Sequence, residues 1–225
     1  MEALVRNHLR ADDSIRKVHR VLGKDDVLAP ALSKLKGLRI VKIDEWECLV
    51  SFVLATYANI PRISKMIEMV SARYGSTIVG DVKAFPTRAQ LGRASMHDLE
   101  KCGLGYRARY IKALCEIIDD RQLERWRRLP YDKLRYELIE LPGVGDKVAD
   151  CVSLFGFGRL ESFPIDVWIE RALARLYGKK GSYAKLREFA AERFGPYAGY
   201  AQEYLYYNER LHAPNGSCLF LEKER

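Results

Sequence analysis

The stretch LPGVGDKVADC, from Leu141 to Cys151, decides the fold of this 225-residue chain. A proline and two glycines fall within its first five residues, and segments with helical spacing of apolar residues flank it on both sides. Glycines allow the sharp backbone turn that joins two helices, so the pattern predicts a helix–hairpin–helix element. The N–H groups at Gly143 and Gly145 would then lie at the positive end of the second helix, and such an arrangement can bind a phosphate. An αα-hairpin that serves packing alone is the other interpretation.

The charge of the chain favours the phosphate interpretation. The formal net charge is +8 with a pI near 9.2, and Lys and Arg are spread along the sequence. A folded basic protein suggests a polyanionic partner, nucleic acid first, although many basic proteins bind none. No apolar run is long enough to cross a membrane, and MEALVRNHLR lacks the apolar core of a signal peptide. We expect no membrane association and an intracellular place, in cytoplasm or nucleoid or in a nucleus.

The cysteines are odd in number and never spaced as CxxC, which argues against a disulfide framework, a zinc site or an iron–sulfur cluster. We expect them to be small buried side chains, and we expect no metal site made by side chains. The five are Cys48, Cys102, Cys115, Cys151 and Cys218.

Apolar residues recur at helical spacing almost everywhere, with no convincing alternating strand, so the predicted fold class is all-α. DEWECLVSFVLATYA, residues 44–58, begins with Asp44 as an N-cap and is apolar on most of its circumference. It is therefore expected to be a buried central helix. Asn59 is expected to cap a second helix that has Pro61 in its first turn and ends at Gly75.

Two charged residues suggest chemistry. Lys147 lies on the first turn after the hairpin, where a lysine usually adds positive charge near a phosphate. The positive helix end and an apolar cleft would both disfavour its charged form, and a neutral amine is a nucleophile. Asp166, in FPIDVW, has the position of an ordinary N-cap. A carboxylate held there would also be suited to stabilise a cationic intermediate.

LPGVGDKVADCVSLF, followed by SFPIDVWIERALARLY, resembles the helix–hairpin–helix base-excision DNA glycosylases that pair a lysine with an aspartate. DEWECLVSFVLATYANIPRISKM and CGLGYRARYIKA are more narrowly similar to the 8-oxoguanine DNA glycosylase/AP lyase family. The resemblance extends from about residue 46 to residue 210. It implies a two-lobed fold with a DNA cleft between the lobes. Residues 44–164 would form a six-helix barrel lobe, and residues 1–43 and 165–225 the second lobe.

The resemblance also implies an enzyme that removes 8-oxoguanine from duplex DNA, expected opposite cytosine. Lys147 would attack C1′ of the flipped nucleotide and form a Schiff base that permits β-elimination, while Asp166 steadies the sugar cation. The protein would act as a monomer without an iron–sulfur cluster or other cofactor; an ion on hairpin carbonyls stays open. Because the chain begins near the first helix shared with the family, we expect the family's amino-terminal sheet domain to be absent. A glycosylase for another damaged base and a non-catalytic DNA-binding module are the alternatives.

Recognition residues carry over from the resemblance one at a time. Tyr106 resembles the wedge that props the duplex open, Arg107 and Arg62 match contacts to the estranged cytosine, and Asn59 matches one residue of an asparagine stretch. Cys151 and Tyr206 lie where the flipped base is sandwiched, and Gln202 where its Watson–Crick edge is read. For each of these residues, the alternative is an ordinary position on a helix face, in the core or on the surface. This alternative is least expected for Tyr106 and Arg107. The chain departs from the family at Tyr57 in the asparagine stretch, and at Trp168 and Glu209, where the family has a histidine–aspartate pair.

Overall fold

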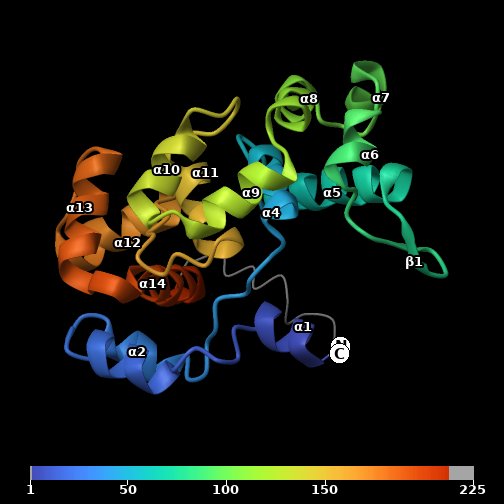
Figure 1. Cartoon of the computed structure of the whole chain (residues 1–225). Helices are drawn as coiled ribbons and strands as arrows, with labels where there is room; N and C mark the ends of the chain where they lie inside the picture. The colour runs from blue at the N-terminus through green and yellow to red at the C-terminus, as the bar shows by residue number, and fades with distance from the viewer. Residues whose placement is uncertain (1, 213–225) are drawn as a thin grey trace. The chain divides into compact units, whose positions relative to one another are not determined.

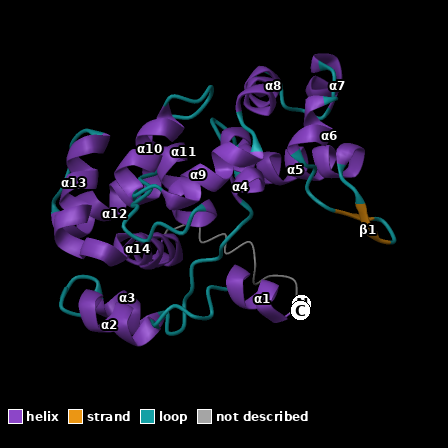
Figure 2. Ribbon diagram, in the orientation of Figure 1, coloured by secondary structure: helices purple, strands orange, loops and turns teal. Residues whose placement is uncertain are grey.

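The computed structural model describes residues 2–212 and divides the chain into two compact units (Figure 1). The central unit is Ile43–Gly158, and the terminal unit combines Met1–Lys42 with Arg159–Arg225. Both consist mainly of helices, which confirms the all-α class (Figure 2). Cys218 lies outside the described residues.

One expectation, the absence of strands, is wrong. The central unit contains a two-stranded antiparallel sheet of β1, Thr77–Val79, and β2, Val82–Lys83. Gly80, with φ +52°, and Asp81 form the two-residue connection. Gly-Asp between β-branched residues is a hairpin signal, but strands of three and two residues are too short to show an alternating pattern.

The central unit is built around one helix, α4 (Glu45–Leu54). It packs against α5, α8, α11 and the π-helical segment η1, and its residues from Trp46 to Leu54 are mostly buried. The Asp44 carboxylate caps it by accepting the N–H groups of Trp46 and Glu47, so the predicted cap and the buried central helix are both confirmed. The other helices of this unit are α5 (Ile60–Tyr74), α6 (Arg88–Gly92), α7 (Met96–Lys101), α8 (Arg107–Ile117), α9 (Asp120–Arg128), α10 (Tyr131–Ile139), α11 (Asp146–Cys151) and η1 (Val152–Gly156).

The terminal unit is assembled from both ends of the chain, with α14 (Ala198–His212) packed against α3, α12 and α13. Asp25 is 5% exposed and accepts bonds from Arg193 Nε at 2.6 Å and the Tyr177 hydroxyl at 3.2 Å. The buried Tyr200 hydroxyl donates to Asp13 at 2.7 Å. These contacts tie the amino-terminal helices to the carboxyl-terminal ones. The remaining elements are α1 (Glu2–His8), α2 (Ile15–Leu22), α3 (Ala29–Lys34), α12 (Val167–Tyr177), α13 (Tyr183–Phe194) and the 3₁₀ turn η2 (Gly195–Tyr197).

Within residues 2–212, no helix has both the length and the apolar character needed to cross a membrane.

We predict that Asp25→Ala lowers the free energy of unfolding by about 2 to 3 kcal/mol, because the buried carboxylate also caps the N–H groups of Val27 and Leu28. Urea denaturation measures the change. Asp26→Ala, at the exposed neighbouring position, is the control and should shift stability by less than about 0.5 kcal/mol. Equal losses in the two variants would contradict this role for Asp25.

Candidate active site

The hairpin in the central unit is braced by buried charge. Asp150 on α11 is fully buried, and its carboxylate accepts the Tyr131 hydroxyl at 2.5 Å and Arg135 Nε at 3.0 Å. A second guanidinium nitrogen of Arg135 bonds to Asp146 at the start of α11. Since Tyr131 and Arg135 both belong to α10, the two helices of the hairpin are held at one fixed approach.

The two hairpin glycines have different roles. Gly143 has φ +79°, and a Cβ there would come within 2.7 Å of the Tyr110 ring, so both conformation and space require glycine. Gly145 occupies the N-cap position of α11, and no side-chain hydrogen bond caps the helix there. A Cβ at Gly145 would meet nothing within 4 Å, so this side of the turn is open. The first turn of α11 therefore presents its backbone N–H groups without a side-chain cap.

Lys147 lies against an aromatic surface. Its half-buried side chain places Nζ 5.6 Å from the centre of the Phe52 ring, and Phe52 stacks on Phe155 with centroids 5.6 Å apart. The face of an aromatic ring attracts an ammonium group and limits where the flexible lysine stem can go. Cys151, one helical turn further on, is buried. This geometry holds one amine in a defined position beside the hairpin.

Asp166 lies in the terminal unit and caps α12. Its Oδ1 accepts the N–H groups of Trp168 at 3.0 Å and Ile169 at 2.9 Å, as the sequence predicts for an N-cap. The segment leading to it is anchored, because the Ile165 N–H donates to the Tyr183 hydroxyl at 3.2 Å. The Asp166 carboxylate is half-buried and held by two backbone donors.

Glu203 is a residue that sequence reasoning missed. It lies on α14, is half-buried, and its pKa is raised to about 7, first by burial and then by the negative charge of Asp166. Burial and the nearby negative charge of Asp166 therefore both favour the protonated form of Glu203. An acid directly after Gln202 in AQEYLYY, whose remaining residues are Ala, Leu and Tyr, was the available signal.

Two predicted base-recognition residues also lie on α14. Gln202 is 5% exposed, and its Oε1 has no hydrogen-bond partner among the described residues. The Tyr206 hydroxyl accepts from Arg210 at 2.9 Å, and the same guanidinium lies 5.4 Å from the Tyr206 ring centre. Gln202 is thus an unpaired buried acceptor, which is rare in folded proteins and calls for an explanation.

The predicted duplex contacts show a mixed result. Arg107 is 1% exposed and donates to the backbone oxygens of Thr56 and Leu104. Its guanidinium is therefore buried and bonded within the protein. Tyr106, 46% exposed, lies beside it with its ring centre 4.5 Å from the guanidinium. Asn59 caps α5 through the N–H of the exposed Arg62, which confirms the predicted cap. The DNA contacts of these residues stay predictions.

The two departures from the family pattern have partners of their own. Glu209 forms a salt bridge with Arg175 at 2.6 Å. The Arg171 guanidinium lies 5.3 Å from the Trp168 ring centre. Glu209 and Trp168 therefore each have an arginine as a neighbour.

Lys147, Cys151 and the hairpin belong to the central unit, whereas Asp166, Gln202 and Tyr206 belong to the terminal unit. The pairings expected across the two units therefore stay predictions. Within the described residues, no three His, Cys, Asp or Glu side chains are grouped to hold a metal ion. The four cysteines in this part of the chain are buried and form no disulfide with one another.

Comparison with known families identifies residues 50–196 as an HhH-GPD superfamily base excision DNA repair protein. The chain belongs to this superfamily. The match includes the hairpin, Lys147 and Asp166, and it ends before the α14 residues Gln202, Glu203 and Tyr206.

Individual HhH-GPD relatives are similar over most of the chain. A probable N-glycosylase/DNA lyase of Methanothermobacter thermautotrophicus is 33% identical over 212 residues, covering 83% of this chain and 68% of the relative. The N-glycosylase/DNA lyase OGG1 of Arabidopsis thaliana is 30% identical over 228 residues, covering 92% of this chain and 62% of the relative. The chain thus spans somewhat under two thirds of the plant protein's length.

One solved structure is similar in both sequence and fold. The 8-oxoguanine glycosylase/lyase of Clostridium acetobutylicum, in complex with double-stranded DNA containing cytosine opposite 8-oxoguanine, is 31% identical with a TM-score of 0.87. The similarity covers 93% of this chain and 74% of that protein.

We predict that Glu203→Gln changes the pH dependence of stability of this HhH-GPD protein. The folded pKa of about 7 lies above the ordinary 4.5, so the folded protein retains a proton that the unfolded chain releases. The free energy of unfolding therefore falls as pH rises from about 4.5 to about 7, and the loss does not grow further above that. The variant lacks this term and should gain up to about 3 kcal/mol over wild type between pH 4.5 and 7.5.

Thermal or urea unfolding at several pH values measures the difference. Glu188→Gln, at an exposed position on α13 in the same unit, is the matched control and should show no such gain. Parallel pH profiles for Glu203→Gln and wild type would contradict the prediction.

Proposed function

We propose that this chain is a bifunctional DNA glycosylase/AP lyase that excises 8-oxoguanine from duplex DNA. The observation that carries the proposal is the combined likeness, in sequence and in fold, to a glycosylase/lyase solved with an 8-oxoguanine duplex. The named relatives from an archaeon and a plant, both N-glycosylase/DNA lyases, support the same reaction.

Lys147 is the proposed nucleophile. Once Asp166 has helped it to lose its ammonium proton, the amine attacks C1′ of the flipped nucleotide. The C1′–N bond to the base breaks with its electron pair leaving on the base, which takes up the proton that the attacking amine releases. Loss of the C1′–O bond then opens the sugar and leaves an imine between Lys147 and C1′. Removal of a proton from C2′ lets the 3′ phosphate leave by β-elimination. The ring of Phe52 restricts the amine to one region before the attack.

Asp166 is the proposed electrostatic partner. As the C1′–N bond breaks, positive charge develops on the sugar, and a fixed carboxylate stabilises that charge without reorganising. The two backbone N–H groups that hold Asp166 supply this rigidity. An amine of the chain forms the new bond and a carboxylate stabilises the developing charge, and we propose that the reaction uses no cofactor.

Duplex DNA is the proposed partner, bound by a monomer with cytosine expected opposite the lesion. The N–H groups of the first turn of α11, which no side chain caps, suit a phosphate, and the net charge of +8 suits the polyanion. The buried, unpaired Oε1 of Gln202 suits the N–H donors on the Watson–Crick edge of a guanine-type base. With Cys151 and Tyr206 as the two faces of the base pocket, this favours an oxidised purine over other damaged bases.

We predict that Lys147→Gln abolishes base release and strand cleavage, because an imine requires a primary amine. Borohydride should trap wild type on an 8-oxoguanine duplex and should not trap the variant. Lys133→Gln removes the same charge from an exposed position on α10 and should be trapped like wild type. Trapping of Lys147→Gln would mean that another amine performs the chemistry.

We predict that Asp166→Asn slows single-turnover excision by about a hundredfold or more, because the charge opposing the sugar cation is lost. Asn is as good an N-cap as Asp, so the melting temperature should stay near that of wild type. The variant should still bind the damaged duplex, since the hairpin is unchanged. Excision at the wild-type rate would reduce Asp166 to a helix cap.

A further inference from the structure

The amino-terminal helices of the terminal unit carry an exposed basic surface. Residues 14–36 contain six lysines and arginines against two acids, Asp25 and Asp26, which gives this stretch half of the chain's net charge of +8. Asp25 is buried and bonded to Arg193, so Asp26 is the exposed acid of the stretch. The six cations are all exposed, and together they form what we call the amino-terminal basic surface: Arg16, Lys17, Arg20, Lys24, Lys34 and Lys36.

The cations of this surface have no carboxylate partner. Among the residues that the structure describes, none of the six side chains forms an ion pair or a hydrogen bond. Other arginines of the same unit are paired: Arg10 with Asp13, Arg175 with Glu209 and Arg193 with Asp25. Like charges that gather without counter-charges attract anionic ligands. The amino-terminal basic surface is therefore available to an anionic partner.

This surface lies away from the residues expected to read the damaged base. The His19 ring of α2 is hydrogen-bonded to the Tyr204 hydroxyl of α14 at 2.9 Å, and the two rings meet edge to face (Figure 1). Tyr204 lies two positions from both Gln202 and Tyr206, and two positions correspond to a turn of about 200° around an α-helix. The helix α2, with its three cations, therefore packs on the opposite side of α14 from Gln202 and Tyr206.

The groups on this surface suit phosphates. Arg16 and Arg20 lie one turn apart on α2, about 6 Å along the helix, and each guanidinium can bond a phosphate through two N–H groups. Beside them is a hollow of about 500 Å³ between α2 and α3, whose lining includes the donors Ser33 and Lys36. Phosphates repeat along both strands of duplex DNA, and cations that neutralise several of them give affinity without reading sequence.

We propose that the amino-terminal basic surface binds the backbone of a second duplex segment while a first duplex is held for base excision. The choice of DNA as the polyanion rests on the proposed function. A lipid surface fits less well, because the apolar residues Val18 and Leu22 of α2 are buried within the unit and do not face outward to enter lipid. A protein with two sites for the phosphate backbone can pass from one DNA segment to another without first dissociating.

The test counts the duplexes that one protein molecule binds, with analytical ultracentrifugation and a duplex too short to reach both surfaces. Wild type should bind two. The triple variant Arg16→Gln/Lys17→Gln/Arg20→Gln should bind the second duplex about tenfold or more weakly, with a log–log salt slope smaller by about three. Its melting temperature and its single-turnover excision of 8-oxoguanine should match wild type, because the three residues are exposed and lie outside the proposed active site.

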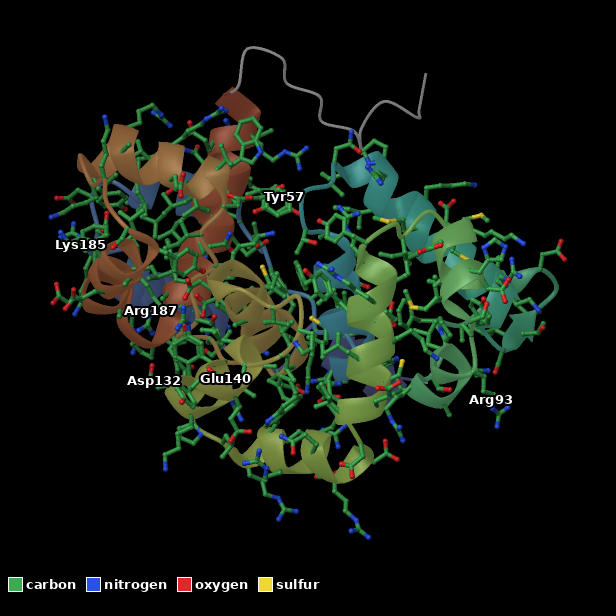
Figure 3. The ribbon with its side chains drawn as sticks, turned by 90° about the horizontal axis from the view of Figure 1, so that it is seen from above. Tyr57, Arg93, Asp132, Glu140, Lys185 and Arg187 are labelled. Carbon is green, nitrogen blue, oxygen red and sulfur yellow. The ribbon has the colours of Figure 1, made fainter. Side chains whose placement is uncertain are left out.

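The matched control is Lys179→Gln/Lys180→Gln/Lys185→Gln, which removes the same charge from exposed positions of the same unit; Lys185 lies on α13 (Figure 3). The control should bind two duplexes. Binding of one duplex by wild type, or an equal loss in the two triple variants, would overturn the proposal. So would anionic lipid vesicles that bind wild type, but not the α2 variant, when no second duplex binds. If wild type bound two duplexes but released no 8-oxoguanine, the proposed function would fail and the second duplex site would stand.

Discussion

A fully buried carboxylate is unfavourable unless hydrogen bonds and positive charge compensate it, and Asp150 imposes that requirement on the hairpin. Its partners, Tyr131 and Arg135, both come from the preceding helix, so α10 and α11 can approach each other in few other ways. Arg135 also reaches Asp146, one turn earlier on α11. Lys147 lies between these two acids along the helix but on another face, directed at Phe52. The position of the amine is thus a consequence of the buried ion pair.

The terminal unit uses charge differently. Asp166 is held by two backbone donors, while Glu203 has burial and a neighbouring negative charge against its ionised form. Burial and a neighbouring negative charge both favour the protonated form of a carboxyl group. The unit therefore keeps Glu203 partly protonated near neutral pH beside a positioned carboxylate. Such an arrangement lowers stability at higher pH, a cost that folded proteins tend to accept at functional sites.

Local chemistry explains what the sequence could predict. The caps at Asp44, Asn59 and Asp166 depend on residues two or three positions away, and all three are found as predicted. The buried helix α4 follows from its apolar circumference. The state of Glu203 could not be predicted, because its burial depends on packing between helices far apart in sequence. The pairing of Lys147 with Asp166 stays a prediction, since the two residues belong to separate units. The DNA contacts also stay predictions.

Arg107 shows how a correct local motif can lead to an incomplete interpretation. The sequence predicts that Arg107 is not simply packed on a helix face, but the side chain is buried, and a carbonyl oxygen 51 positions earlier, on Thr56, accepts from it. Satisfying that buried charge fixes the α4–α5 turn, and the fixed turn forces Tyr57 into its strained, exposed conformation. The buried arginine thus anchors the turn on which the exposed Tyr57 lies.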